Sequence, residues 1–284
     1  MLLLGSNPSA PFRKGGRGDL RYLQVENKFK KIAITAAKNA GLILKKNLGK
    51  PRSIEYKGVI DIVTEMDRKA EDLIIKTIKK EFPEHGILTE ESNERKSSSE
   101  YRWIIDPLDG TTNYSHGYPV FCVSIALEKE GEIILGVVYD PVLGELFTAE
   151  KDKGAFVNNK KIKVSKVREL TKSLLATGFP YDVRTSRQNN LDHFSNFAVK
   201  AQAIRRAGSA ALDMCYVAYG RFDGFWEIKL KPWDTAAAML IIREAGGMVT
   251  DFNGGPFSMY SGETLASNGL IHNEMLNVLH HKTK

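Results

Sequence analysis

The sequence lacks long apolar runs and has very few cysteines. No hydrophobic stretch approaches the roughly 18 residues that a membrane-spanning helix needs. The opening run, Met1 to Leu4, is too short for the core of a signal peptide, and no charged segment precedes it. We therefore expect a cytoplasmic protein that does not associate with a membrane. The two cysteines, Cys122 and Cys215, stand among apolar neighbours, which favours buried reduced thiols over a disulfide or a catalytic nucleophile.

The length and composition indicate a large folded region with one disordered end. At 284 residues and 42% hydrophobic residues, the chain can bury a large core as one domain or two packed halves. Residues 1–24 combine Pro, Gly and Ser with basic residues, which predicts a disordered basic tail; an RNA-binding arm is the alternative. Residues 25–284 are expected to form one domain, with an α+β half at 25–165 and an α/β half at 166–284. The net charge of +7 suits an anionic substrate, but without a clustered basic motif it is weak evidence for nucleic-acid binding.

The periodicity of the apolar residues predicts helices and strands in a mixed order. Spacings of three and four from Phe29 to Leu48 predict a helix that faces the core. A second helix is expected from Glu65 to about Phe82, with Thr64 as its N-cap. Strand-like runs after residue 120 predict an antiparallel meander, and strands alternate with helices after about residue 173. This order favours an α/β (α+β) fold of stacked sheets and helices without an internal repeat.

The stretch from Trp103 to Asn113, which reads WIIDPLDGTTN, is the first candidate for chemistry. A short apolar strand leads into a turn that carries the carboxylates Asp106 and Asp109, and residues that can open a helix follow. Two carboxylates on a bent loop can hold hard cations, and the free N–H groups of a helix N-terminus can bind an anion. The stretch therefore predicts a site for metal and phosphate. The plain alternative is a turn that only joins a strand to a helix.

Three more acidic residues are candidates because of where they stand along the chain. Glu90 follows a short strand, Asp234 stands at a helix start in KPWDTAAA, and Asp67 lies in the first turn of the second helix. Each also has an ordinary explanation, as a solvated residue, a helix cap or a partner of the helix dipole. Glu90, Asp234 and the two aspartates of the turn fall at junctions that cluster on one edge of α/β sheets. Four carboxylates without His or Cys favour Mg²⁺ or Mn²⁺ over Zn²⁺.

Together these motifs resemble the inositol monophosphatase family. Four blocks carry the resemblance, in the order and spacing of the family: DIVTEMD at 61–67, EES at 90–92, WIIDPLDGTTN at 103–113 and PWD at 232–234. Thr89 departs from the pattern, because glycine commonly precedes the glutamate pair. The run RRAGSAALD at 205–213 is most similar to the bacterial branch. The resemblance covers the chain from about Phe29 to Leu279 and implies a layered αβαβα sandwich of the sugar-phosphatase type.

The resemblance also implies a set of metal ligands. Glu90, Asp106 and the Leu108 backbone carbonyl would hold one Mg²⁺, and Asp106, Asp109 and Asp234 would hold a second. A third, weaker ion near Glu90 and Mn²⁺ in place of Mg²⁺ are alternatives. Two cations that share a carboxylate can neutralise a phosphate dianion and stabilise both oxygens of an in-line displacement. Sensitivity to lithium, by competition at the second ion, is implied as well.

The catalytic residues that the resemblance implies are Glu90, Thr111 and Asp67. Water is the implied nucleophile, activated by the ion that Glu90 binds, and Thr111, linked to Asp67, would relay its proton. The matched set contains no nucleophilic side chain, so we expect no covalent phosphoenzyme. The implied substrate contacts are Asp109, the N–H groups of Gly110 and Thr111, the Ala210 backbone, Arg205 and Glu227. For Arg205 and Glu227, salt bridges at the surface or at a subunit interface are the alternative.

The sequence thus predicts a Mg²⁺-dependent phosphomonoesterase that acts on myo-inositol monophosphates or related sugar phosphates. Fructose-1,6-bisphosphatase activity, alone or as a second activity, is one alternative. A binding protein in transcription antitermination with RNA polymerase is another, because some bacterial relatives have that role. The resemblance also implies a homodimer. The intact acidic set favours the enzyme, since a scaffold has no need of costly carboxylates around one place.

Overall fold

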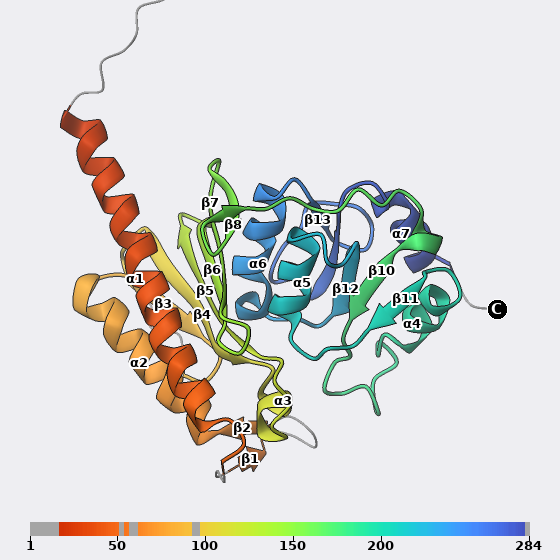
Figure 1. Cartoon of the computed structure of the whole chain (residues 1–284), viewed down its shortest axis with the longest axis horizontal. Helices are drawn as coiled ribbons and strands as arrows, with labels where there is room; N and C mark the ends of the chain where they lie inside the picture. The colour runs from red at the N-terminus through yellow and green to blue at the C-terminus, as the bar shows by residue number, and fades with distance from the viewer. Residues whose placement is uncertain (1–16, 51–53, 57–61, 93–96, 282–284) are drawn as a thin grey trace, which may run out of the picture.

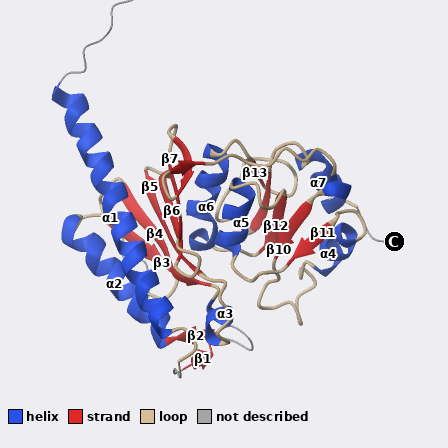
Figure 2. Ribbon diagram, viewed as in Figure 1, coloured by secondary structure: helices blue, strands red, loops and turns tan. Residues whose placement is uncertain are grey.

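Layers of helices and sheets alternate across the molecule. The computed structural model describes residues 17–50, 54–56, 62–92 and 97–281. The α-helices in this part of the chain are α1 (Arg17–Asn47), α2 (Glu65–Glu81), α3 (Thr111–Ser115), α4 (Leu191–Ala198), α5 (Ala210–Ala218), α6 (Pro232–Glu244) and α7 (His272–Leu279). In Figures 1 and 2, α1 and α2 cover one sheet, α5 and α6 lie between the two sheets, and α4 and α7 cover the other. The αβαβα sandwich expected from the sequence is confirmed.

The sheet of the N-terminal half has seven strands in the order β3-β4-β5-β6-β7-β8-β9. Their bounds are β3 (Gly86–Thr89), β4 (Tyr101–Asp109), β5 (Cys122–Lys129), β6 (Glu132–Asp140), β7 (Glu145–Glu150), β8 (Gly154–Val157) and β9 (Lys160–Lys161). Only β3 and β4 are parallel, and the other neighbours are antiparallel. The predicted meander is therefore present.

The second sheet has five strands in the order β11-β10-β12-β14-β13. Their bounds are β10 (Leu174–Thr177), β11 (Ala203–Arg205), β12 (Gly224–Ile228), β13 (Met248–Thr250) and β14 (Glu263–Ser267). The first three strands of that order run parallel, and β14 is antiparallel to both of its neighbours. A separate antiparallel pair joins β1 (Ile54–Tyr56) and β2 (Ile62–Thr64) just before α2.

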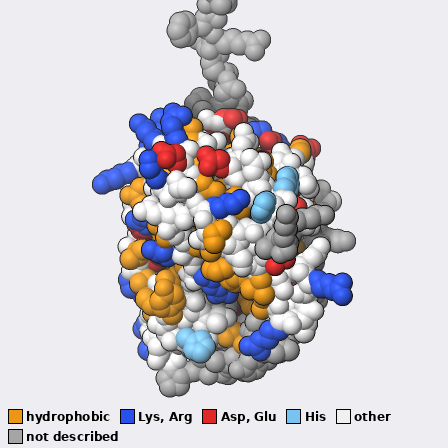
Figure 3. Space-filling model, turned by 90° about the vertical axis from the view of Figure 1, so that its right-hand side faces the viewer, with side chains coloured by type: hydrophobic (Ala, Val, Ile, Leu, Met, Phe, Trp, Pro, Cys, Tyr) orange, Lys and Arg blue, Asp and Glu red, His pale blue; other side chains and the backbone are white. Residues whose placement is uncertain are grey.

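The apolar cores lie between the layers, and strand alternation fills them. Along β4, Trp103 and Ile105 face the core beneath α1 and α2, whereas Ile104 faces the core around α5 and α6. This is the two-residue period of a strand with both faces covered. A third core lies under α4 and α7. On the outer face of that side, Lys and Arg side chains are spread among hydrophobic ones (Figure 3), so that face carries no uniform basic surface.

Small residues bring the central helices close to the first sheet. Gly136 of β6 lies directly under α6, and a Cβ there would stand 2.5 Å from the carbonyl oxygen of Ala237. Ala236, Ala237 and Ala238 are completely buried. The close approach keeps α6, whose first turn carries Asp234, at a fixed height over the ends of the strands.

The sequence placed most of these elements but not the start of the first helix. Helix α2 and its Thr64 cap are confirmed. Helix α1 begins at Arg17, so residues 17–24 are helical and the prediction of a tail up to residue 24 was wrong for them. Extending an existing helix costs little compared with starting one, and no proline interrupts this stretch. Residues 1–16 lie outside the described part. The division of the domain into halves stays a prediction.

Two further expectations can be compared with the structure. Cys122 and Cys215 are buried and form no disulfide, and burial raises the pKa of both thiols well above the usual value. Both are therefore buried free thiols, as expected. Among the described residues, no helix has the length and apolarity that would let it cross a membrane.

Candidate active site

A cavity of about 460 Å³ collects most of the predicted site residues. Its wall is formed by the end of β4, the starts of α3, α5 and α6, and the segments after β3, β10 and β12. The predicted residues that line it are Glu90, Asp106, Leu108, Asp109, Gly110, Thr111, Ala210, Glu227 and Asp234. They come from both sheets, so the cavity exists only because the two halves pack together.

An irregularity in β4 explains how Asp106 and Asp109 face the same space. In a regular strand, residues three apart point to opposite faces of the sheet. The pairing of β4 with β5 changes register between Asp106 and Asp109, and such a bulge re-aims the side chains that follow it. The Leu108 N–H donates to Asp106 Oδ1 over 2.9 Å and fixes the bend. The sequence predicted a turn after the strand, whereas the strand continues through Asp109.

Gly110 allows the chain to leave β4 at a sharp angle. Its φ is +96°, and a Cβ would stand 2.9 Å from the Val120 carbonyl oxygen, so both the conformation and the space require glycine. The helix that follows, α3, has only five residues. Asn113 on α3 donates to the carbonyl oxygens of Val120 and Ala207, both over 2.8 Å, which ties the turn to the segment that leads into α5.

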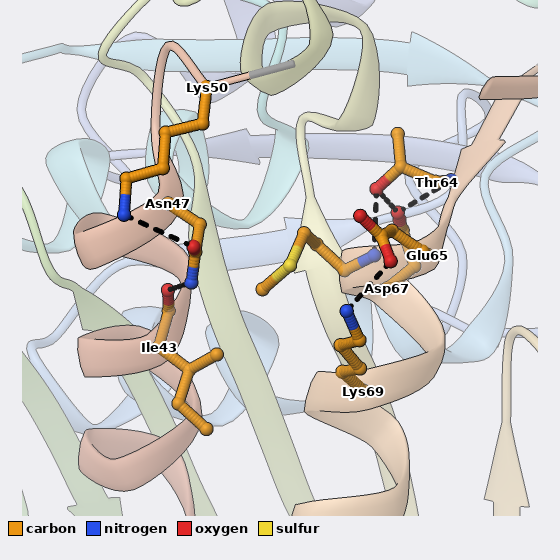
Figure 4. A network of polar contacts seen from close by, with 8 residues as sticks. Ile43, Asn47, Lys50, Thr64, Glu65, Asp67 and Lys69 are labelled. Carbon is orange, nitrogen blue, oxygen red and sulfur yellow. Dashed lines mark hydrogen bonds and ion pairs between the residues drawn. The ribbon is translucent and has the colours of Figure 1, made fainter. Parts of the chain in front are cut away.

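Asp67 lies behind the cavity and reaches it through Thr111. Its Oδ2 accepts hydrogen bonds from the Thr64 N–H (2.8 Å) and hydroxyl (2.6 Å), which forms the capping box of α2 (Figure 4). Its Oδ1 accepts a hydrogen bond of 2.8 Å from the Thr111 hydroxyl. The Thr111 hydroxyl also lies 2.9 Å from the Leu108 carbonyl oxygen. With its hydrogen directed to these acceptors, Thr111 can itself act as an acceptor toward the cavity.

Glu71 holds the segment that carries Glu90, and it was not among the predicted site residues. This buried carboxylate accepts hydrogen bonds from the Thr89 hydroxyl and the Glu91 N–H, which are the residues on either side of Glu90. Thr89, where the family commonly has glycine, thus gains a partner. The signal was available, because Glu71 stands four residues after Asp67 on α2 and therefore on the same helix face.

Asp109 and Asp234 are held by groups at the starts of helices. Asp109 Oδ2 accepts hydrogen bonds from the Ser209 hydroxyl (2.6 Å) and the Ala211 N–H (2.8 Å). Asp234 Oδ2 accepts one of 2.7 Å from the Lys231 N–H. In both cases the hydrogen bonds use one carboxylate oxygen, which leaves the other for a ligand. Ser209, which also caps α5, was not among the predicted site residues.

Three acidic residues of the cavity have raised pKa values. Burial, followed by the negative charges of Glu90, Asp109 and Asp234, raises the pKa of Asp106 well above its ordinary value. Burial and the charge of Asp109 raise the pKa of Asp234 to about 8. Burial raises the pKa of Asp109 too, although its hydrogen bonds from Ser209 and Ala211 oppose the rise. These carboxyls cannot all ionise at neutral pH without a positive charge among them.

The residues fit a divalent cation in chemistry. All the candidate ligands are oxygens, as Mg²⁺ prefers, and a cation would remove the repulsion that raises their pKa values. Within the described ranges, no group of three or more His, Cys, Asp or Glu side chains is arranged to hold a metal ion as it stands. Binding therefore requires the side chains to close on the ion, and the assignment of ligands belongs to the proposed function.

Arg205 is the one predicted substrate contact that does not line the cavity, and its role stays a prediction. Its side chain is exposed, and its guanidinium donates to the Ile204 carbonyl oxygen over 3.1 Å. The arginine that lines the cavity is its neighbour, Arg206. Residues that follow one another in an extended segment point in opposite directions, so a one-residue difference decides which arginine faces the cavity. The double arginine in the sequence gave no signal to choose between them.

The structure thus sets an acidic, oxygen-lined cavity at the strand ends of a layered α/β fold. The sequence model of the inositol monophosphatase family matches residues 26–284, and the chain belongs to that family. Enzymes of this family are generally Mg²⁺-dependent phosphatases, and the family match supports phosphatase activity for this chain.

Named relatives point to two roles. The chain is 43% identical over 248 residues to an inositol-1-monophosphatase of Mesorhizobium japonicum and 45% identical over 248 residues to the Nus factor SuhB of Escherichia coli. Both alignments cover 86% of this chain and 93% of the relative. Among solved structures, an inositol monophosphatase from Anabaena is 44% identical with a TM-score of 0.82, over 89% of this chain and 95% of that one.

Proposed function

We propose that the chain hydrolyses monophosphate esters of inositol or of related polyols with the help of Mg²⁺. The observation that carries the proposal is the convergence of Glu90, Asp106, Asp109 and Asp234 on one cavity. Asp106, Asp109 and Asp234 have raised pKa values, and each accepts its hydrogen bonds on one oxygen. This arrangement costs stability unless a cation binds, and therefore favours a binding role over a structural one.

The proposed ligands divide between two ions. Glu90, Asp106 and the Leu108 carbonyl oxygen would hold the first, and Asp106, Asp109 and Asp234 the second; a third ion and Mn²⁺ remain alternatives. When bound, the ions would neutralise the phosphate and lower the pKa of an attacking water. Glu71 positions Glu90 through the residues on either side of it.

The chain's own groups would orient the water and the phosphate. Thr111 donates to Asp67, so its oxygen can accept a hydrogen bond from a water in the cavity and pass the proton on. Asp67 is completely buried, and burial raises its pKa despite the hydrogen bonds from Thr64 and Thr111, which suits an acceptor of that proton. The N–H groups of Gly110 and Thr111 would bind the phosphate oxygens.

The proposal is tested by measuring phosphate release from a panel of esters, with Mg²⁺ and with EDTA. We expect the wild type to hydrolyse an inositol monophosphate only with Mg²⁺. Asp109→Asn should lose at least about 10³-fold in kcat, because the variant removes a metal ligand and not an apolar core contact. Circular dichroism provides the control that the variant is folded. Near-normal turnover by Asp109→Asn, or no hydrolysis of any ester by the wild type, would reject the proposal.

A second candidate function is supported by the relatives named Nus factor SuhB. We infer that the chain also binds an RNA polymerase complex, and that binding and catalysis coexist. Co-purification of tagged wild type and Asp109→Asn with RNA polymerase tests this, since equal recovery of polymerase would separate binding from turnover. No recovery with either would exclude it. Fructose-1,6-bisphosphatase activity, the homodimer, inhibition by lithium and the cytoplasmic location stay predictions.

A further inference from the structure

Two buried carboxyl groups of the cavity have no hydrogen-bond partner within the described residues. Asp213, on α5, is 2% exposed, and its Oδ1 atom is buried without a partner. Glu227, on β12, is 9% exposed, and neither of its oxygens receives a hydrogen bond from the residues described. Both side chains line the cavity. A buried carboxyl without a partner is costly, so both are expected to serve a ligand.

The other buried acidic residues of the described chain show that the two are exceptional. Asp67, Glu71, Asp106, Glu128, Asp140 and Asp223 are all buried, and each accepts at least one hydrogen bond. The fold therefore satisfies buried acids wherever they have a structural role. Only at Asp213 and Glu227, which both face the cavity, does it leave the acceptors open.

Both groups line the same cavity, and each is set on a regular element of the fold. Glu227 has its pKa raised to about 8, first by burial and then by the negative charge of Asp213. Its carboxyl packs against the Cα of Gly178, where any side chain would overlap it. The backbone of Asp213 is fixed because the residue lies in the first turn of α5. Two carboxyls without partners in the wall of one cavity suit two hydrogen-bond donors of one ligand.

Arg206 indicates that those donors are neutral. It lines the same cavity, and its positive charge acts on both Asp213 and Glu227. A cationic ligand group would meet this charge, whereas hydroxyl groups donate hydrogen bonds without carrying one.

We infer that Asp213 is a substrate-binding residue that, with Glu227, accepts hydrogen bonds from two hydroxyl groups of the alcohol part of the ester. Asp213 would then select polyol phosphates over phosphates of simple alcohols. This inference rests on the proposed phosphatase function. It assigns a role to a residue that the sequence motif contained but did not explain.

Two esters with the same ring test the inference. Inositol monophosphate carries hydroxyl groups around the ring, and cyclohexyl phosphate has none. Asp213→Asn should lower kcat/KM for inositol monophosphate about 5- to 10-fold, the usual effect of losing a hydrogen bond between neutral groups. For cyclohexyl phosphate the change should stay below about threefold. The Mg²⁺ concentration for half-maximal turnover of cyclohexyl phosphate should not change, which shows that the ions are unaffected.

Asp223→Asn is the matched structural control. Asp223 is also a buried aspartate, but both of its oxygens are used, by the Ser165 hydroxyl and the Leu174 N–H. Asp223→Asn should lower Tm by several degrees and leave the preference between the two esters unchanged. Asp213→Asn should keep Tm or raise it, because the Asp213 carboxyl has no hydrogen bond within the described residues that the variant would lose.

The outcomes separate the two levels of the argument. The role in selection would be overturned if Asp213→Asn left the ratio of kcat/KM for the two esters unchanged, whether both values fell equally or neither fell. Equal kcat/KM of the wild type for cyclohexyl phosphate and inositol monophosphate would also overturn it, but the phosphatase function would stand. A wild type that hydrolyses neither ester would refute the proposed function, and the inference with it.

Discussion

Replacing Asp234 by asparagine should make the metal-free protein more stable while it destroys activity. The Asp234 carboxyl has a pKa of about 8 in the folded chain, against 3.8 ordinarily. A carboxyl whose pKa is raised by folding reduces the free energy of unfolding as pH rises between the two values, and has no such effect below the lower one. Asparagine keeps an oxygen that can accept the Lys231 N–H and removes the charge.

The size of the effect follows from the shift. Each pKa unit corresponds to about 1.4 kcal/mol, and roughly three units separate 3.8 from pH 7. About 4 kcal/mol is therefore the upper bound at pH 7, and repulsion shared with the other carboxyls brings the expected gain to about 2–4 kcal/mol. For a chain of this size, that corresponds to a rise in Tm of about 5–10 °C.

Thermal unfolding between pH 4 and 8 measures the effect. In EDTA at pH 7 to 8, Asp234→Asn should melt above the wild type, and the two should converge near pH 4. With Mg²⁺ the order should reverse, because binding to the native state stabilises only the protein that keeps the ligand. A variant that is less stable than the wild type at every pH in EDTA would refute the reasoning. It would show that Asp234 acts as an ordinary helix cap.

Two other substitutions test the neighbours of the site. Thr111→Val removes the hydroxyl between Asp67 and the cavity, so steady-state assays should show a loss of about 10²–10⁴ in kcat with little change in KM. Thr111→Ser keeps the hydroxyl and should retain most of the activity. A fully active valine variant would exclude a proton relay. Gly136→Ala places a Cβ 2.5 Å from the Ala237 carbonyl oxygen, so urea unfolding should show a loss of about 1–3 kcal/mol. An unchanged midpoint would mean that β6 and α6 can separate without cost.

Local sequence signals predicted the parts of the site that depend on neighbours in the chain. Thr64 and Asp67 form a capping box, and the spacing between them is enough to recognise it. A proline, a glycine and two carboxylates within a few residues predicted a bend at Asp106 and Asp109, which the structure forms as a bulge within β4. Helix α2 was located well because its apolar stripe is long and regular.

Contacts between layers could not be predicted in this way. Ser209 holds Asp109 across 100 residues of sequence, and Glu71 holds Thr89 across 18. Glu71 shares a helix face with Asp67, but no local pattern pairs it with Thr89 or pairs Ser209 with Asp109, because the distance between such partners is set only when the layers pack. Short strands such as β8 and β11 were missed for a related reason, since a few residues cannot display a period. Which of the two arginines, Arg205 or Arg206, lines the cavity depends on the same packing.

Asp109 joins the two halves of the molecule, and this has a consequence for how the protein can be altered. Its backbone belongs to the first sheet, but its carboxylate is held by Ser209 and Ala211 at the start of α5. A change in the spacing of the sheets would displace the Asp109 carboxylate from the other site residues. A displacement of about 1 Å at a reacting centre can lower the rate about a hundredfold. Activity should therefore depend on the thickness of the central helical layer, which residues such as Gly136 set. An engineer seeking a sturdier protein has freedom on the outward surfaces of α1 and α7, where added bulk leaves that dimension untouched.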